Sequence, residues 1–105
     1  VVLINEMTFS GASLIAHYIK QSGRGELVGT TSGGSSRQTY GGTMHTHRLG
    51  PAGELTLTVP NYILKLPKPI PGNVAPDHEV IYSRENLLEG EDAQLQVAKM
   101  VLGIE

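Results

Sequence analysis

The beginning of the chain combines a continuous apolar run with apolar positions at helical spacing. Val1 to Ile4 are all apolar, which predicts a strand that is buried on both faces and covered by helices. From about Ser10 to Gln21 the spacing predicts a largely buried helix that Gly23 ends. Its apolar positions are Ala12, Ile15, Ala16 and Ile19, widened by Leu14 and Tyr18. Residues 26–29 predict a second strand, so the chain opens with a strand, helix, strand unit.

The middle of the chain predicts a glycine-rich loop followed by antiparallel strands. Residues 30–42 are rich in Gly, Ser and Thr, and we expect them to form a loop over a site. Residues 43–49 and 54–59 predict a β-hairpin in which Leu55, Leu57 and Val59 face inward. A further strand is predicted over residues 62–66. The prolines at positions 67, 69, 71 and 76 then favour an extended segment without regular structure.

The last third of the chain predicts one short strand and two helices. Val80 to Tyr82 form an apolar run typical of a strand, and residues 84–89 predict a short helix that Gly90 stops. Residues 92–102 predict an amphipathic helix with Leu95, Ala98 and Leu102 on one face. The predicted fold class is therefore α/β with an antiparallel appendage, in a single domain that spans residues 1–105.

Composition and charge narrow the class of protein. At 105 residues with 39% apolar content, the chain is long enough for one modest core. The net charge of -2 and a pI near 6.1 give no basic surface for nucleic acid or an anionic membrane. The chain has no cysteine, which excludes disulfides and thiolate chemistry. Its apolar runs are too short to predict a membrane-spanning segment.

Ser10 is the most informative single residue, because it lies at the junction of the predicted first strand and helix. The free N–H groups of a helix's first turn lie near such a serine, and donors of this kind stabilise the negative charge of an acyl-transfer transition state. Serine is also a preferred residue for capping a helix N-terminus. Position alone therefore leaves open whether Ser10 is a nucleophile or a helix cap.

Several segments resemble the tail-specific (C-terminal-processing) serine peptidase family, in the same order along the chain. The first is Val2 to Ser13, VLINEMTFSGAS, which resembles the segment around the family's active serine. The others are RGELVGTTSGG at 24–34, LTLTVP at 55–60, Gly72 to Val80 with VAPD inside it, and GEDAQL at 90–95. Together they extend from Val1 to about Leu102, so the likeness covers nearly the whole chain.

The resemblance implies part of a crotonase/ClpP-like fold and a peptide or protein substrate. It implies that Ser10 is the nucleophile and that the backbone N–H of Gly11 is an oxyanion donor, while Gly33 and Gly34 in the loop are candidate substrate-binding residues. The sequence differs from the family pattern at one important position. Tail-specific members have a lysine there that serves as the base, and this chain has Ser35.

The loop sequence Thr31-Ser32-Gly33-Gly34 is more similar to the tricorn-core branch of the family. In that branch the base is a histidine upstream of the nucleophile strand. We therefore expect this chain to be the C-terminal fragment of a catalytic domain that lacks its general base.

Other titratable residues offer weaker candidates. His17 lies about two helical turns from Ser10, roughly 10 Å at about 1.5 Å per residue, too far for a direct hydrogen bond. His45 and His47 share a face of the predicted hairpin, but two imidazoles make an incomplete metal site. Glu6 is a candidate for orienting the site or binding a substrate amine, and His78 is interpreted as a solvated loop residue. None of the four lysines Lys20, Lys65, Lys68 and Lys99 has the family's spacing from Ser10.

Three hypotheses follow for the function. The first is a serine peptidase that acts through an acyl-enzyme on Ser10, and the second is a catalytically degenerate relative that binds peptides or proteins. The third is a small metal-binding module that uses His45 and His47. For the leading hypothesis we expect no metal, no cofactor and no nucleic-acid partner. The resemblance also implies a periplasmic or cell-envelope location in bacteria, and uncovered apolar surface on the first strand and helix predicts self-association into homo-oligomers.

Overall fold

A parallel strand pair with an intervening helix forms the first part of the computed structural model, which describes residues 1–35, 38–68 and 71–104. Strand β1 (Val2–Ile4) pairs in parallel with β2 (Leu27–Gly29), and α1 (Gly11–Ser22) connects them. Gly23 ends α1 in the left-handed conformation, with φ 62°, and donates its N–H to the carbonyl of Lys20. The predicted strand, helix, strand unit is confirmed.

A third parallel strand completes this small sheet. Strand β5 (His78–Glu79) pairs with β2, which gives the order β1-β2-β5. The strand predicted at Val80 to Tyr82 is wrong in position. Because β2 ends at Gly29, the last bond to it is from the Val80 N–H to the Gly29 carbonyl. Beyond Val80, no strand in the described part of the chain pairs with residues 81–82.

The apolar core lies between α1 and one face of the sheet. It consists of Ile4, Ala16, Leu27 and Val74, with Val2 and Ile19 packed against it. Two burial predictions are wrong. Leu3 points to the other face of β1 and is 45% exposed, and α1 buries only the side that carries Ser13, Ala16 and His17. Ile15 and Tyr18 are more than half exposed because no second layer of the described residues covers them.

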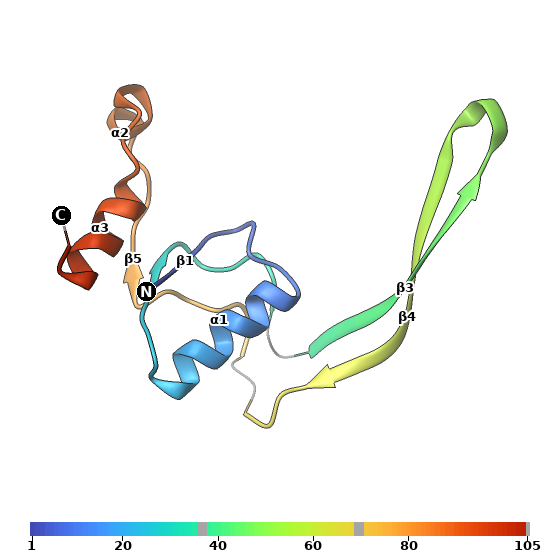
Figure 1. Ribbon diagram of the computed structural model, residues 1–105, viewed down its shortest axis with the longest axis horizontal. Helices are drawn as coiled ribbons and strands as arrows, with labels where there is room; N and C mark the ends of the chain where they lie inside the picture. Colours follow the sequence, from blue (N-terminus) through green and yellow to red (C-terminus); the bar gives the residue numbers. More distant parts are fainter. Residues whose placement is uncertain (36–37, 69–70, 105) are drawn as a thin grey trace.

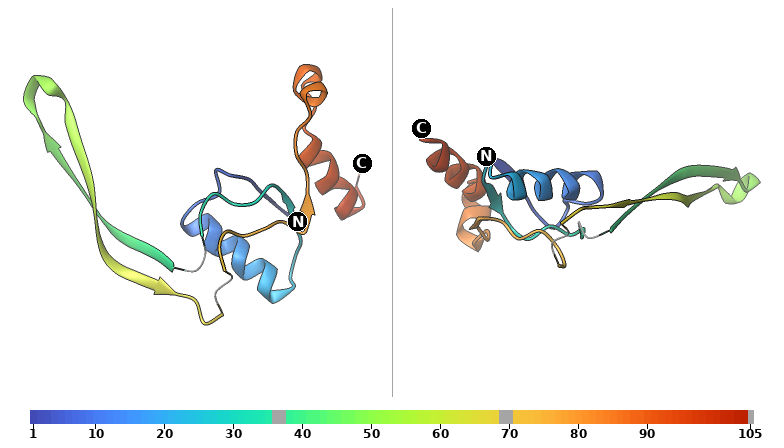
Figure 2. Two further views of the ribbon diagram at one scale, coloured as in Figure 1. Left: turned by 180° about the vertical axis from the view of Figure 1, so that it is seen from behind. Right: turned by 90° about the horizontal axis from the view of Figure 1, so that it is seen from below.

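A long β-hairpin projects from this body, as Figures 1 and 2 show from three directions. Within the described ranges, strands β3 (Gln38–Arg48) and β4 (Glu54–Lys65) pair with each other only, and the turn η1 (Gly50–Ala52) joins them. The hairpin was predicted, but it is longer than expected. Residues 62–65 of the predicted strand at 62–66 are the end of β4, and residues 38–42 of the predicted loop at 30–42 belong to β3. Residues 36–37 of that loop lie outside the described residues.

The strand register shifts between Gly41 and Gly42, because Gly41 pairs with Tyr62 and Gly42 with Pro60. Asn61 on β4 is therefore the extra residue of a β-bulge. The residues that were expected to face inward share one face of the hairpin and are about half exposed. On that face, register places His47 opposite Leu55, His45 opposite Leu57 and Thr43 opposite Val59. The radius of gyration is 17.6 Å, against about 13 Å for a compact chain of this length, because the hairpin extends away from the body.

Two helices follow the sheet. Helix α2 (Arg84–Glu89) begins at a capping box on Ser83, and α3 (Ala93–Leu102) begins at Asp92, whose carboxylate accepts the Leu95 N–H. Both positions agree with the prediction. On the predicted apolar face of α3, Ala98 is buried as expected, whereas Leu95 and Leu102 are exposed and Gln94 is buried instead. The Gln94 amide donates to the carbonyl of Val80, which ties α3 to the end of β5.

The predicted extended segment is confirmed as far as it is described. Residues 66–68 and 71–77 contain neither helix nor strand apart from an isolated bridge between Ser35 and Asn73, and residues 69–70 lie outside the described part. None of the helices in the described ranges is long and apolar enough to cross a membrane. The fold is mixed α/β, with a parallel sheet and a hairpin.

Candidate active site

The chain leaves β1 through a turn that its own polar side chains hold. The Asn5 side chain accepts the Met7 N–H, and the Asn5 carbonyl accepts the Thr8 N–H, both at 2.9 Å. The Thr8 hydroxyl in turn accepts the Asn5 N–H at 3.0 Å. Asn and Thr favour such local bonds, which turn the chain at the carboxyl end of the strand and direct it into α1.

Ser10 follows this turn with a strained backbone. Its φ of 51° and ψ of -121° are those of the first central position of a type II′ turn, which glycine normally occupies. Ser10 is the one non-glycine residue with positive φ in the described ranges. A backbone of this kind costs about 1–3 kcal/mol and persists only where the surroundings hold it.

The hydroxyl of Ser10 is exposed and makes no capping hydrogen bond, although Ser10 occupies the N-cap position of α1. The Phe9 carbonyl accepts the Ala12 N–H at 2.9 Å instead, and the Ser10 carbonyl accepts the Leu14 N–H. The helix-cap interpretation of the side chain is therefore wrong. The first N–H of the helix, that of Gly11, has no hydrogen-bond acceptor among the described residues.

The glycine loop after β2 packs directly against this turn. A Cβ at Gly33 would lie 1.9 Å from the Glu6 carbonyl oxygen and 2.8 Å from the Phe9 ring, and a Cβ at Gly34 would lie 2.7 Å from the Ser13 hydroxyl oxygen. The Gly34 N–H donates to the Thr8 carbonyl at 3.0 Å. Close packing thus explains both glycines, and their substrate-binding role stays a prediction.

Ser32 fixes the loop to the segment that follows the hairpin. Its buried hydroxyl accepts the Val74 N–H at 2.9 Å and donates to the Gly34 carbonyl at 2.8 Å. The Ser32 N–H also donates to the Val74 carbonyl. Ser32, before the hairpin, and Val74, after it, are therefore hydrogen-bonded to each other.

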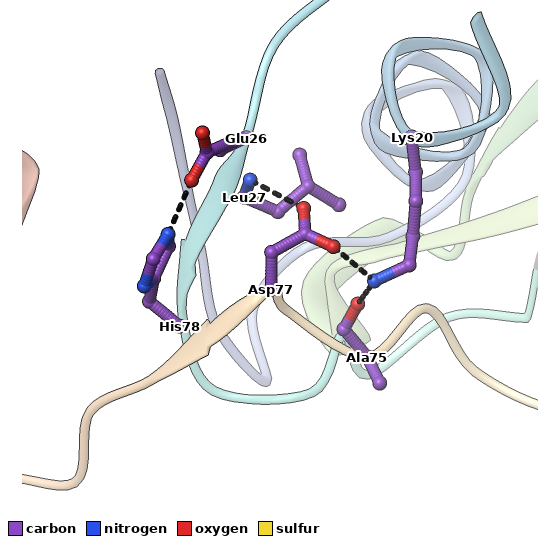
Figure 3. Close-up of polar contacts among 6 residues, drawn as sticks. All are labelled: Lys20, Glu26, Leu27, Ala75, Asp77 and His78. Atoms are coloured by element: carbon purple, nitrogen blue, oxygen red, sulfur yellow. Dashed lines mark hydrogen bonds and ion pairs between the residues drawn. The ribbon is translucent and has the colours of Figure 1, made fainter. Parts of the chain in front are cut away.

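Asp77 anchors the same segment to α1 and β2, as Figure 3 shows. Its carboxylate accepts Lys20 Nζ at 2.7 Å and the Leu27 N–H at 2.9 Å, and Lys20 also donates to the Ala75 carbonyl. The hydrogen bond from Lys20, and after it the bond from the Leu27 N–H, lowers the pKa of Asp77 from its ordinary 3.8. The contacts of Asp77 with Lys20 and Leu27 were not predicted from the sequence. The only pattern that pointed to this residue was the Pro76-Asp77 pair.

The three positions considered for the general base, Ser35, His17 and Lys20, have other surroundings in the structure. Ser35, at the position of the family lysine, donates to the Gly72 carbonyl at 2.9 Å. His17 is 1% exposed on the buried side of α1, about two turns beyond Ser10. Lys20 is paired with Asp77 at the far end of the helix. None of these side chains is in a position to accept the Ser10 proton directly.

The remaining candidate residues lie apart from one another. The Glu6 carboxylate accepts the Thr30 hydroxyl at 3.1 Å, at the carboxyl ends of β1 and β2. His45 and His47 lie on the hairpin, and no three His, Asp or Glu side chains in the described ranges group to hold a metal ion. His78 was wrongly interpreted as a loop residue, because it lies in β5 opposite Val28 and its ring contacts the Glu26 carboxylate.

An exposed serine on a strained turn between a strand and a helix is an arrangement typical of serine hydrolases. Comparison with known protein families matches residues 1–80 to Peptidase family S41, the tail-specific or C-terminal-processing protease family. The chain belongs to this family of serine peptidases, whose fold is of the ClpP/crotonase type. No curated protein matches the chain.

Proposed function

We propose that Ser10 is the nucleophile of a serine peptidase. The observation that carries the proposal is the backbone of Ser10, whose positive φ leaves the hydroxyl exposed and uncapped ahead of the first N–H groups of α1. Strain of this kind collects at active sites, where it holds a reacting group in place. Membership of a serine peptidase family supports the same assignment.

In the proposed reaction, Ser10 Oγ attacks the carbonyl carbon of the scissile peptide bond while its proton passes to a general base. The carbonyl oxygen becomes an oxyanion, and the Gly11 N–H, at the positive end of the helix dipole, donates a hydrogen bond to it. The C–N bond then breaks, and the amine leaves with the proton from the base. Water hydrolyses the resulting serine ester and restores the hydroxyl.

We propose further that the base comes from outside the described residues. The described side chains that could accept a proton are either remote from Ser10 or engaged elsewhere, and the serine at position 35 cannot replace a lysine. The proposal is the one that the likeness to the tricorn-core branch suggested, a residue from another segment.

Labelling with a fluorophosphonate tests the nucleophile, because this probe forms a covalent bond with activated serines. The intact natural protein that carries this sequence is expected to gain the probe on the peptide that contains Ser10, and Ser10→Ala is expected to remain unlabelled. Ser22→Ala is a matched control, since that hydroxyl donates to the Ile19 carbonyl at the other end of α1. Labelling of Ser10→Ala at the wild-type rate would exclude Ser10.

A second function is favoured by one observation, the serine at position 35. A relative that has lost its base would keep the fold and bind peptides without cleaving them. In that case the folded wild-type protein would stay unlabelled under conditions that label other serine peptidases, while it still bound peptides.

A further inference from the structure

We propose that Ser13 is a positioning residue that holds the backbone of Ser10 in its strained conformation. The inference rests on the proposed role of Ser10 as nucleophile. It assigns to a buried hydroxyl, in the first turn of α1, a task that the reaction itself does not require of it.

The contact of Ser13 is unusual for a helical serine. A serine inside a helix normally bonds back to the carbonyl three or four residues earlier, which here would be Ser10 or Phe9. The Ser13 hydroxyl instead passes both and donates to the Thr8 carbonyl at 2.9 Å, outside the helix. It therefore connects the helix to the peptide that leads into the serine turn.

Burial makes this bond effective. Ser13 is 0% exposed, so water does not compete for the hydroxyl, and an unpaired hydroxyl at this place would lose a hydrogen bond without replacement. Serine has a modest helix propensity, and alanine would suit a buried helical site better if packing were the only demand. A serine at position 13 is therefore explained by its hydrogen bond to the Thr8 carbonyl and not by a preference of the helix for serine.

The Thr8 carbonyl receives a second donor from the glycine loop. The Gly34 N–H donates to it at 3.0 Å, and a Cβ at Gly34 would come within 2.7 Å of the Ser13 hydroxyl oxygen and 3.3 Å of the Ser10 nitrogen. Ser13 and Gly34 thus fix one carbonyl from the helix and from the loop. With that carbonyl fixed, Phe9 and Ser10 must connect it to the first turn of α1 over a short path, which accounts for the positive φ.

Fluorophosphonate kinetics on the intact natural protein test the proposal, with the maximal acylation rate separated from the half-saturating probe concentration. Ser13→Ala is expected to lower the maximal rate about tenfold, because loss of the bond lets the nucleophile leave its reactive position. The half-saturating concentration is expected to stay unchanged. Ser13→Thr, which keeps the hydroxyl, is expected to recover most of the rate, and Ser22→Ala is expected to match the wild type.

A second measurement is independent of activity. The one-bond Cα–Hα coupling of Ser10 in NMR spectra reports the sign of φ, and Ser13→Ala is expected to move it from the positive-φ value toward that of ordinary residues. If Ser13→Ala does not fold, Ser13→Cys serves instead, because a thiol fills a similar space but is a much weaker hydrogen-bond donor than a hydroxyl.

The outcomes separate this inference from the proposed function. Wild-type acylation and an unchanged coupling in folded Ser13→Ala would overturn the inference alone. A folded wild type that is never acylated would overturn the proposed function, and the coupling would then decide the positioning role by itself. A rate that falls equally in Ser13→Ala and Ser13→Thr would also count against the hydroxyl.

Discussion

Gly33 and Gly11 lie close to the same serine, yet a methyl group would meet different surroundings at each. At Gly33 it would come within 1.9 Å of the Glu6 carbonyl oxygen, a backbone atom that cannot move aside alone, whereas at Gly11 nothing lies within 4 Å. We expect Gly33→Ala to lower the free energy of unfolding by about 1–3 kcal/mol. Urea denaturation measures the change, and Gly11→Ala, expected to cost nothing, is the control. Equal stability of the two variants would contradict the packing of the loop on the turn.

Asp77 gives the molecule a pH-dependent contribution to stability. Its pKa is lowered in the folded state by Lys20 and the Leu27 N–H, so the contribution is fully present above the unfolded value and is lost as the pH falls through the folded one. We expect Asp77→Asn to cost about 1–2 kcal/mol at pH 7. Its stability should then decline less than that of the wild type between about pH 5 and pH 2.

Thermal melts across this pH range measure the effect of Asp77. Glu54→Gln is a suitable control, because the Glu54 carboxylate pairs with Arg48 at 3.4 Å on the exposed hairpin, and such pairs contribute about 0–1 kcal/mol. Wild-type and Asp77→Asn curves that run parallel at all pH values would show that Lys20 and Leu27 do not act through the carboxylate charge.

At the scale of elements, the sequence predicted which segments form helices and strands more reliably than which sides they bury. Helical spacing, Gly23 and the Ser83 and Asp92 caps are local signals, and α1, α2 and α3 lie close to where these placed them. Burial is set by partners from other parts of the fold. The apolar spacing of α3 predicted the buried position of Ala98, but it could not reveal that Gln94 would be buried in place of Leu95 and Leu102.

The same limit applies to the candidate site. The strand-to-helix junction and the family likeness pointed to Ser10, but its backbone angles depend on contacts between residues distant in sequence. The bond from Gly34 to Thr8 spans the whole of α1 and β2, and the Asp77 anchor spans the hairpin as well. No local pattern contains these two contacts, which is why Asp77 was not predicted. The bond from Ser13 to Thr8 is local, but it ends outside the helix, where helical spacing does not indicate it.

At the scale of the whole molecule, stability is expected to be uneven. An isolated two-stranded hairpin is at best marginally stable in water, whereas the three-stranded sheet is held by the core and by the Asp77 anchor. Amide hydrogen exchange measured by NMR should therefore be at least roughly tenfold faster at Thr46 and Thr56 than at Val28. Equal protection would show that another surface covers the hairpin.

The hairpin also bears on how the chain folds. About 45 residues separate Ser32 from Asp77, and closing a loop of that length by random search loses entropy that grows with the logarithm of its length. Pairing of β3 with β4 brings its two ends together and leaves about 17 residues to close, which reduces the cost by roughly 1 kcal/mol. Formation of the hairpin before the sheet would thus shorten the route by which Val74 and Asp77 reach their partners. Residues inserted at the hairpin tip, between Gly50 and Gly53, are therefore expected to change the folding rate little. Substitutions that disrupt the β3–β4 pairing near Tyr62, close to the body, are expected to slow folding.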